Sequence, residues 1–277
     1  MLDLVKKMAR NFGLEIRRVP RHSVTGEQQQ YPYIESFQMN GISFDYWITD
    51  NMYRDWYNPT AQAGWCINEG YVKLVAPDDK VLEVGCNAGF TTCLLSRAVG
   101  PNGLVVGLDI IPKNCLLSAA QIGLNAITNT RILNRGAADY PGKIWVTNKN
   151  NGSVDTKRSP GAIEVDVVCC DDLIAEYGHF DVIKVDVEGF ESQVFKGARK
   201  LMEKRPKLLL EVHGSDVEKY GSSYDELFRL ISASDYEGFM CLDPNSATSS
   251  NQLVPFDREH VLRTKSHGNL FLRARGS

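Results

Sequence analysis

Two apolar, strand-like segments each run directly into side chains that could do acid–base or metal chemistry. The segment FDVIKVDVEGFE carries Asp186, Glu188 and Glu191 at or just after its alternating apolar residues. The segment KLLLEVH ends with Glu211 and His213 close together. In open α/β sheets, ligands bind at the carboxyl ends of the strands. These side chains are therefore candidates for catalysis.

Three interpretations of this group remain open. In the first, Asp186 or His213 is a general base that takes a proton from a hydroxyl group. Crowding of the carboxylates in a half-buried cleft would raise their pKa values and couple them. In the second, Asp186, Glu188 and Glu211 bind a divalent cation such as Mg²⁺. In the third, the acids cap the following helix, whose dipole favours negative charge at its start. We prefer capping for Glu191 and a functional role for Asp186 and His213.

A glycine-rich turn at the end of an earlier strand indicates a nucleoside ligand. The strand VLEV runs into the turn GCNAG (residues 85–89), whose glycines let the backbone approach a ligand closely. A second strand ends at Asp109, and an acid at this spacing can accept hydrogen bonds from both ribose hydroxyls. Glu83, just before the turn, would repel a pyrophosphate but suits an ammonium group. The combination favours S-adenosylmethionine, which carries an amino acid, a ribose and an adenine but no phosphate.

Two other classes of protein stay open at this point. A nicotinamide-dependent reductase would also use Gly85 and Asp109, but the turn lacks the third glycine of the dinucleotide motif G-x-G-x-x-G. A non-catalytic binding module would need neither the carboxylates nor the histidine.

Alternating strand and helix patterns from Lys80 onward predict the scaffold that positions these side chains. Strands are expected at KVLEVG, LVVGLDI, RILNRGA, FDVIKVDV, KLLLEVH, FMCLD and NLFLRAR, and helices at GFTTCLLSRAV, 113–124, 192–203 and 224–233. Such alternation is typical of a mostly parallel sheet covered by helices on both faces. KIWVT and AIEVDVVCC lie between the third and fourth strands, separated by a polar run that we expect to be a mobile surface loop.

The region before this alternation is predicted to be a cap. We expect residues 1–75 to form an N-terminal helix and hairpin cap, and residues 76–277 to form the cofactor-binding domain. Apolar residues between Leu2 and Ile16 recur at helical spacing and predict a helix that packs on the main domain or on a second subunit, which leaves a homo-oligomer open. The strands YIESFQM and ISFDYWI flank Asn40-Gly41, a strong hairpin signal.

Composition narrows the class of partner and the compartment. The formal net charge of −3 gives no basic footprint for nucleic acid. No apolar run reaches the length of a membrane span, and basic residues near the N-terminus interrupt any secretion signal. The seven cysteines are scattered, without paired CxxC motifs, which indicates free thiols in a reducing compartment. We predict a cytoplasmic protein.

Taken together, these segments resemble the FkbM-type methyltransferases. The similarity is carried, in order, by VLEVGCNAGFTT, GLDIIPKN, NAITNTRILNRGAADYPG, DDL, FDVIKVDVEGFESQVFKGARKLMEKRPKLLLEVH and NLFLRAR. It implies an S-adenosylmethionine-dependent enzyme with the class I methyltransferase (Rossmann-like) fold. That fold is an α/β architecture with a seven-stranded, mostly parallel sheet and helices on both faces.

The resemblance also implies roles for individual residues. The residues expected to bind the methionine portion are Glu83, Gly85, Asn87 and Gly89. Asp109 is expected at the ribose, and Ala138 and Asp139 beside the adenine. Phe90 and Ile110 are further candidates for cofactor binding. The catalytic candidates, which would face the sulfonium and the acceptor, are Asp186, Glu188, Glu211 and His213.

We therefore predict an O-methyltransferase that acts on a hydroxyl group of a small molecule. A sugar, a glycosylated compound or a polyketide-type natural product is the expected acceptor. A bound Mg²⁺ remains an open possibility, and no nucleic-acid partner or membrane span is expected.

Overall fold

The computed structural model describes residues 30–57, 66–147, 152–242 and 252–276. The predicted helix between Leu2 and Ile16 lies outside these ranges. None of the helices in the described part of the chain combines the length and the apolar character that a membrane crossing requires.

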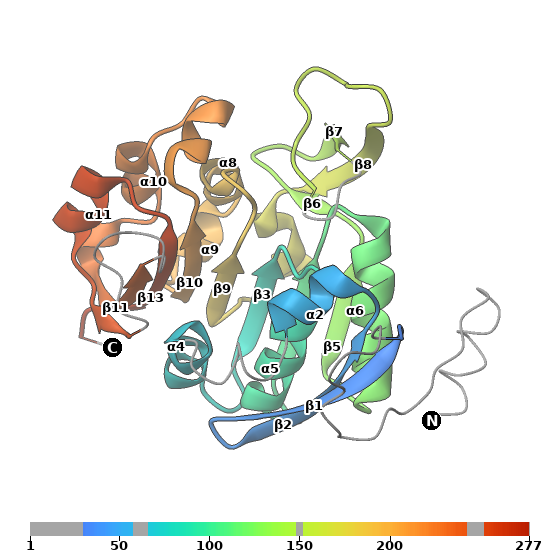
Figure 1. The fold of residues 1–277 in the computed structure, drawn as a ribbon. Coiled ribbons are helices and arrows are strands. Elements are labelled where there is room, and N and C mark those ends of the chain that lie inside the picture. Colours follow the sequence, from blue (N-terminus) through green and yellow to red (C-terminus); the bar gives the residue numbers. More distant parts are fainter. Residues whose placement is uncertain (1–29, 58–65, 148–151, 243–251, 277) are drawn as a thin grey trace.

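An eight-stranded sheet forms the centre of the molecule, in the order β12-β11-β13-β10-β9-β3-β4-β5 (Figure 1). Its strands are β3 (Lys80–Val84), β4 (Leu104–Leu108), β5 (Thr130–Leu133), β9 (Val182–Val185), β10 (Lys207–Val212), β11 (Tyr236–Leu242), β12 (Val254–Pro255) and β13 (Gly268–Ala274). The strands from β10 to β5 are parallel, and β13 runs antiparallel to both of its neighbours. The predicted seven-stranded, mostly parallel sheet is confirmed, and the short β12 adds an eighth strand at one edge.

Helices cover both faces of this sheet. One face carries α2 (Asn51–Tyr57), α4 (Cys66–Leu74), α5 (Phe90–Val99) and α6 (Pro112–Leu124). The other carries α7 (Ile174–Tyr177), α8 (Glu191–Lys196), α9 (Arg199–Glu203), α10 (Tyr224–Leu230) and α11 (Arg258–Thr264). Short 3-10 helices are η1 (Cys170–Leu173), η2 (Gly214–Tyr220) and η3 (Ala233–Asp235). Val81 packs toward the first face and Leu82 toward the second, so the strands are apolar on both sides.

The order of the strands creates a crevice at one edge of the sheet. The chain passes from β3 through β4 to β5, and then returns to β9 on the other side of β3. The direction of winding therefore switches between β3 and β9. At such a switch point the connections leave in opposite directions, so the carboxyl ends of the two strands border an open space.

The predicted hairpin forms its own two-stranded sheet, β1 (Tyr33–Met39) and β2 (Ile42–Ile48). Asn40 and Gly41 have φ values of 50° and 79°, as a tight two-residue turn requires. The buried side chain of Gln121 on α6 accepts a hydrogen bond from the backbone N–H of Trp47 (2.8 Å) and donates one to its carbonyl (2.9 Å). The hairpin is therefore attached to the helical layer and does not extend the central sheet.

The third predicted strand is divided between two sheets. RILNRGA forms β5, which ends at Leu133, and β6 (Gly136–Ala137). β6 belongs to a three-stranded sheet with β8 (Ile163–Val168) and β7 (Gly142–Val146). The small sheet lies above the carboxyl ends of the main strands (Figure 1).

The helix predicted over 192–203 is broken into α8 and α9. The break falls at Gly197, where an added Cβ would lie 2.0 Å from the carbonyl oxygen of Ala138. The chain needs a glycine here because the backbone of the small sheet approaches it closely.

Cys66 on α4 and Cys241 on β11 form a disulfide. The expectation of free cysteines is wrong for this pair. The other five cysteines, which are Cys86, Cys93, Cys115, Cys169 and Cys170, carry free thiols. Spacing alone could not reveal the pair, because 175 residues separate its members.

Candidate active site

A cavity of about 630 Å³ opens at the carboxyl ends of β3, β4, β9 and β10. Its wall includes residues from the glycine-rich turn, from the ends of β4, β9 and β10, and from the cap. This volume is in the range of sites that bind small molecules and cofactors. The sequence predicted a site at this edge, and four separate strand ends contribute to it.

Gly85 allows the glycine-rich turn to lie directly against the end of β9. Its φ is +87°, and an added Cβ would lie 1.8 Å from the carbonyl oxygen of Asp186. The N–H of Gly85 donates to the carbonyl of Leu108 (2.9 Å). Asn87 follows in the left-handed region, with a φ of 46°. The turn thus brings the ends of β3, β4 and β9 together around one space.

Asp109 lies at the end of β4 and lines the cavity. One carboxylate oxygen accepts from the N–H of Asn87 (2.8 Å), and the other accepts from the N–H of Ile111 (2.8 Å) and from the side-chain amide of Asn114 (3.2 Å). Burial raises the pKa of Asp109, and these donors oppose the shift. The carboxylate of Asp109 is therefore fixed by hydrogen bonds to the glycine-rich turn and to the start of α6.

Glu83 differs from the expectation, because it does not line the cavity. It is fully buried, and strand alternation turns it toward α5, where it accepts from the Thr92 hydroxyl (2.6 Å). The ammonium of Lys184 lies 3.5 Å from its other oxygen. Burial raises the pKa of Glu83, while Lys184 and Thr92 lower it. Glu83 therefore bonds to groups behind the glycine-rich turn. Its side chain would have to leave Thr92 and Lys184 before it could contact an ammonium group of the cofactor.

Lys184 connects this buried acid to the cavity, and sequence reasoning missed it. Its Nζ donates to the carbonyl of Gly85 (2.9 Å) and lies 3.3 Å from Asp186 Oδ2. Burial lowers the pKa of Lys184, but Asp186 and Glu83 outweigh that effect and hold it well above its ordinary value. A lysine inside an apolar strand pattern was the signal, since it must be paired when buried.

The predicted cofactor-binding residues other than Glu83 divide into those that line the cavity and those that do not. Gly85, Asn87, Phe90, Asp109 and Ile110 line the cavity.

Gly89, Ala138 and Asp139 do not line it. Gly89 precedes α5 with a φ of +84°, and an added Cβ would lie 2.6 Å from Ser118 Oγ, so its role is to pack helices closely. Ala138 is buried against Gly197, and Asp139 is exposed. The reason is that β6 carries the chain into the small sheet, so that Gly136 and Ala137 form this part of the wall in their place.

All four predicted catalytic residues line the same cavity. Nε2 of His213 lies 3.7 Å from Asp186 Oδ1, 3.7 Å from Glu188 Oε2 and 4.0 Å from Glu211 Oε1. Glu188 has a φ of 55°, which is uncommon for a residue with a side chain. The structure therefore brings together three carboxylates around one imidazole.

Glu191 holds the imidazole of His213 in place. It is fully buried at the start of α8, and one of its oxygens accepts from the N–H of Gly189 (3.0 Å) and lies 2.6 Å from His213 Nδ1. Burial lowers the pKa of His213, but the bond to Glu191 and the charges of Asp186 and Glu211 raise it to about 10. Glu191 thus lies in the first turn of α8 but does not cap it, because its bond goes to Gly189, ahead of the helix, and its contact with His213 is a role that the sequence did not reveal.

The carboxylates in the group respond differently to burial. Burial raises the pKa of Glu188, partly offset by His213. Burial and the charge of Asp186 raise the pKa of Glu211. For Asp186, burial acts in the same direction, but Lys184 and His213 outweigh it and lower the pKa. Asp186 is therefore the carboxylate that is best kept ionised, against the expected rise in its pKa, and it carries no proton of its own when a hydroxyl group donates to it.

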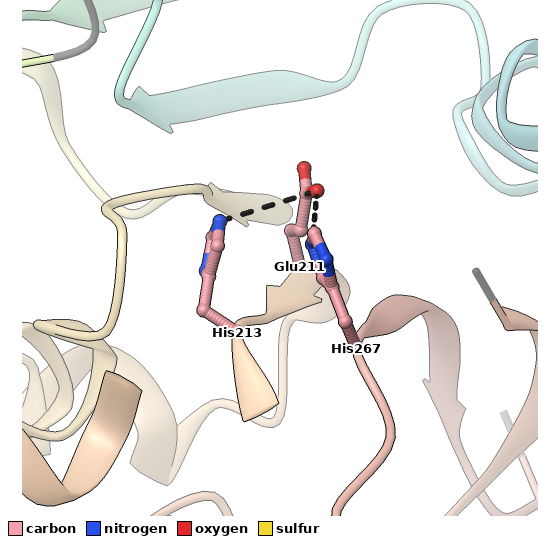
Figure 2. A group of neighbouring side chains, drawn as sticks. All are labelled: Glu211, His213 and His267. Atoms are coloured by element: carbon pink, nitrogen blue, oxygen red, sulfur yellow. Dashed lines mark hydrogen bonds and ion pairs between the residues drawn. The ribbon is translucent and has the colours of Figure 1, made fainter. Parts of the chain in front are cut away.

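His267 and several cap residues complete the wall and were not predicted as site residues. His267 Nε2 lies 2.8 Å from Glu211 Oε1 (Figure 2). Trp56, Tyr57 and Tyr71 line the cavity, whereas Tyr46 is fully buried in the core. The aromatic residues of the cap thus serve both as core and as wall.

A glycine-rich turn, a buried acid at the end of β4 and a cluster of carboxylates meet at the switch point of this α/β sheet, where such folds bind their ligands. A model of the methyltransferase FkbM domain matches residues 83–237, which is more than half of the chain. The chain therefore belongs to the FkbM methyltransferase family, as the resemblance predicted. The family is one of S-adenosylmethionine-dependent methyltransferases.

Other matches are more limited. A model of protein-L-isoaspartate(D-aspartate) O-methyltransferase matches residues 19–139. An arsenite methyltransferase from Halobacterium salinarum is 33% identical over 64 residues, which are 23% of this chain and 16% of that protein.

Solved structures of methyltransferases are similar to the chain at low sequence identity. The methyltransferase FkbM from Methylobacillus flagellatus KT has a TM-score of 0.45 and 17% identity, covering 74% of this chain and 50% of that one. The precorrin-6y C5,15-methyltransferase from Geobacter metallireducens GS-15 has a TM-score of 0.42 and 7% identity, covering 74% and 87%. The chain thus spans half of the FkbM structure and a small part of the arsenite methyltransferase.

Proposed function

We propose that this protein is an O-methyltransferase that methylates a hydroxyl group of a small molecule. The observation that carries the proposal is that Asp109 and Asp186 line one cavity from two strand ends on either side of β3. One carboxylate is suited to a ribose, and the other is suited to an acceptor hydroxyl beside it. The best acceptor class is a sugar, a glycosylated compound or a polyketide-type natural product.

The charges of the cavity favour an uncharged acceptor. Asp186, Glu188 and Glu211 all line the wall, and they would repel a carboxylate such as the one that a protein isoaspartate methyltransferase modifies. Trp56 and Tyr57 supply apolar surface to the same cavity, which suits the ring of a sugar or an aromatic compound.

The residues of the chain act by positioning and by proton transfer. S-adenosylmethionine, when bound, supplies an electrophilic methyl group on a sulfonium. Asp109 and the turn at Gly85 would hold the nucleoside, and Asp186 would accept the proton of the acceptor hydroxyl. Holding the two reactants in line can lower the barrier by several kcal/mol, because the entropy of bringing them together is lost on binding instead.

Calorimetry with S-adenosylhomocysteine tests the cofactor half of this proposal. We expect Asp109→Asn to weaken binding by about 10- to 100-fold, since it removes the charge and replaces one of the two acceptor oxygens with an N–H donor, which cannot accept from a ribose hydroxyl. Asp181→Asn is the matched control, because its side chain accepts from the N–H of Lys80 at the opposite end of the sheet. Equal affinity in the two variants, or no binding by the native protein, would contradict the proposal.

A screen of hydroxylated small molecules with labelled S-adenosylmethionine tests the acceptor half. Transfer of label to a compound whose hydroxyl becomes a methyl ether is the expected result, and Asp186→Asn should abolish most of it. The role of residues 1–75 in choosing the acceptor, a homo-oligomer and a cytoplasmic location stay predictions.

A further inference from the structure

A second chemical function is built into the acceptor side of the cavity. Glu211 and His213 lie at the end of β10, two residues apart, so strand alternation places both on the same side. Val212 pairs with Gly268 across the antiparallel β10–β13 ladder. His267, which immediately precedes β13, is therefore brought beside them.

We propose that Glu211, His213 and His267 bind a divalent transition-metal ion. One donor atom from each residue lies within 4.8 Å of the others, and all three residues line the cavity. Figure 2 shows both imidazoles directed at the same carboxylate. Ligands about 2.1 Å from one ion are separated by roughly 3 to 4 Å, so the three groups need only small side-chain rotations to share it.

The surroundings of His213 support this assignment independently of the three ligands. The fully buried Glu191 bonds to Nδ1 of His213 at 2.6 Å and leaves Nε2 directed toward the cavity. Histidines that bind metals almost always make such a bond from their second ring nitrogen, which fixes the tautomer and the orientation. Glu191 can remain buried because it is hydrogen-bonded to this imidazole and to the N–H of Gly189, so the ring is fixed in one orientation.

The donor set indicates which ions bind. Two imidazole nitrogens and one carboxylate favour Mn²⁺, Fe²⁺, Co²⁺ or Zn²⁺ over Mg²⁺, which prefers oxygen ligands and retains its water. This differs from a Mg²⁺ site formed by Asp186, Glu188 and Glu211. It also leaves Asp186 outside the ligand set, 3.7 Å from His213 Nε2, where a carboxylate could still take a proton.

The metal site also restricts the class of acceptor, an inference that rests on the proposed function. Three protein ligands leave open coordination positions toward the cavity, so an acceptor with two neighbouring oxygens, such as a vicinal diol, can chelate the ion. The proton of one hydroxyl passes to Asp186, and that oxygen forms a bond to the methyl carbon. The carbon–sulfur bond breaks with its electron pair on sulfur, which yields a methyl ether and S-adenosylhomocysteine.

Metal titration of the full chain tests the site without an acceptor. The protein is treated with a chelator and dialysed. Mn²⁺ binding is then followed by loss of the free-ion electron paramagnetic resonance signal, and Co²⁺ binding by visible absorption. We expect one ion per chain, with Mg²⁺ a weak competitor. His267→Asn should weaken Mn²⁺ binding by more than about 10-fold, and Glu191→Gln by about 10- to 100-fold.

His179→Asn is the matched control, because His179 is exposed and lies before β9, at the opposite end of the strand from the cavity. His267 is 43% exposed at its side chain, so its replacement should not prevent folding. No uptake of Mn²⁺ or Co²⁺, or uptake unchanged by His267→Asn, would overturn the site. Metal uptake by a protein that does not bind S-adenosylhomocysteine would support the site and count against the proposed function alone.

Discussion

Replacing Gly85 with alanine should damage both the stability of the protein and its cofactor site. The new Cβ would lie 1.8 Å from the carbonyl oxygen of Asp186, whereas real Cβ atoms essentially never come closer than 3.0 Å to another heavy atom. The ends of β3 and β9 must therefore separate by at least 1.2 Å, the difference between these two distances. The backbone N–H groups of Gly85 and Asp186 are hydrogen-bonded to the carbonyls of Leu108 and Val84, and the contact is with a backbone oxygen, so no flexible side chain can absorb the shift.

Gly100→Ala provides a control that separates the two sources of this cost. Gly85 and Gly100 have φ values of +87° and +71°, but an added Cβ at Gly100 meets nothing within 4 Å. A backbone conformation with positive φ costs an alanine about 1–3 kcal/mol, and Gly100, with a ψ of −177°, lies in a region that is essentially restricted to glycine. The steric conflict at Gly85 adds about 1–3 kcal/mol, as overpacking does elsewhere. We expect losses in unfolding free energy of about 2–6 kcal/mol for Gly85→Ala and about 1–3 kcal/mol for Gly100→Ala.

Urea denaturation measures the stability of both variants, and calorimetry measures their affinity for S-adenosylhomocysteine. Gly85→Ala should weaken binding by about 10-fold or more, because a misplacement near 1 Å is enough to disturb an aligned site. Gly100→Ala should bind as the native protein does, since it lies at the far end of α5. If the two variants lost the same unfolding free energy and kept the same affinity, the close contact of the turn with β9 would be refuted.

Two further predictions concern buried contacts outside the ligand-binding wall. Gly197→Ala should lower the unfolding free energy by about 1–3 kcal/mol, because its Cβ would lie 2.0 Å from the carbonyl oxygen of Ala138. Gly123→Ala is the control: its Cβ would lie in open space on α6, and it should raise the unfolding free energy by about 0.5–1 kcal/mol. Equal effects in urea denaturation would contradict the close approach. Lys184→Met should cost about 3–5 kcal/mol, since it leaves Glu83 buried without its cation, and adding Glu83→Gln should recover part of that loss. Strictly additive effects in the double variant would show that the pair is not coupled.

The local sequence was sufficient to predict the main helices and strands and the edge of the sheet where the candidate site lies. Strand patterns such as KVLEVG and KLLLEVH are apolar on both faces, and the Asn40-Gly41 pair suits only a tight turn. These signals depend on neighbouring residues and on backbone conformation. For the same reason, the residues that follow the strands directly, such as Asp109 and Asp186, were found from the sequence.

Residues whose roles depend on distant partners were decided only by the tertiary structure. Glu83 was expected in the ligand site, but its partners Thr92 and Lys184 come from other elements and bind it beneath the turn. His267 enters the cavity because β13 pairs with β10 across more than fifty residues of chain. A side chain's chemistry is set by what surrounds it, and those surroundings form only when strands far apart in sequence are brought side by side.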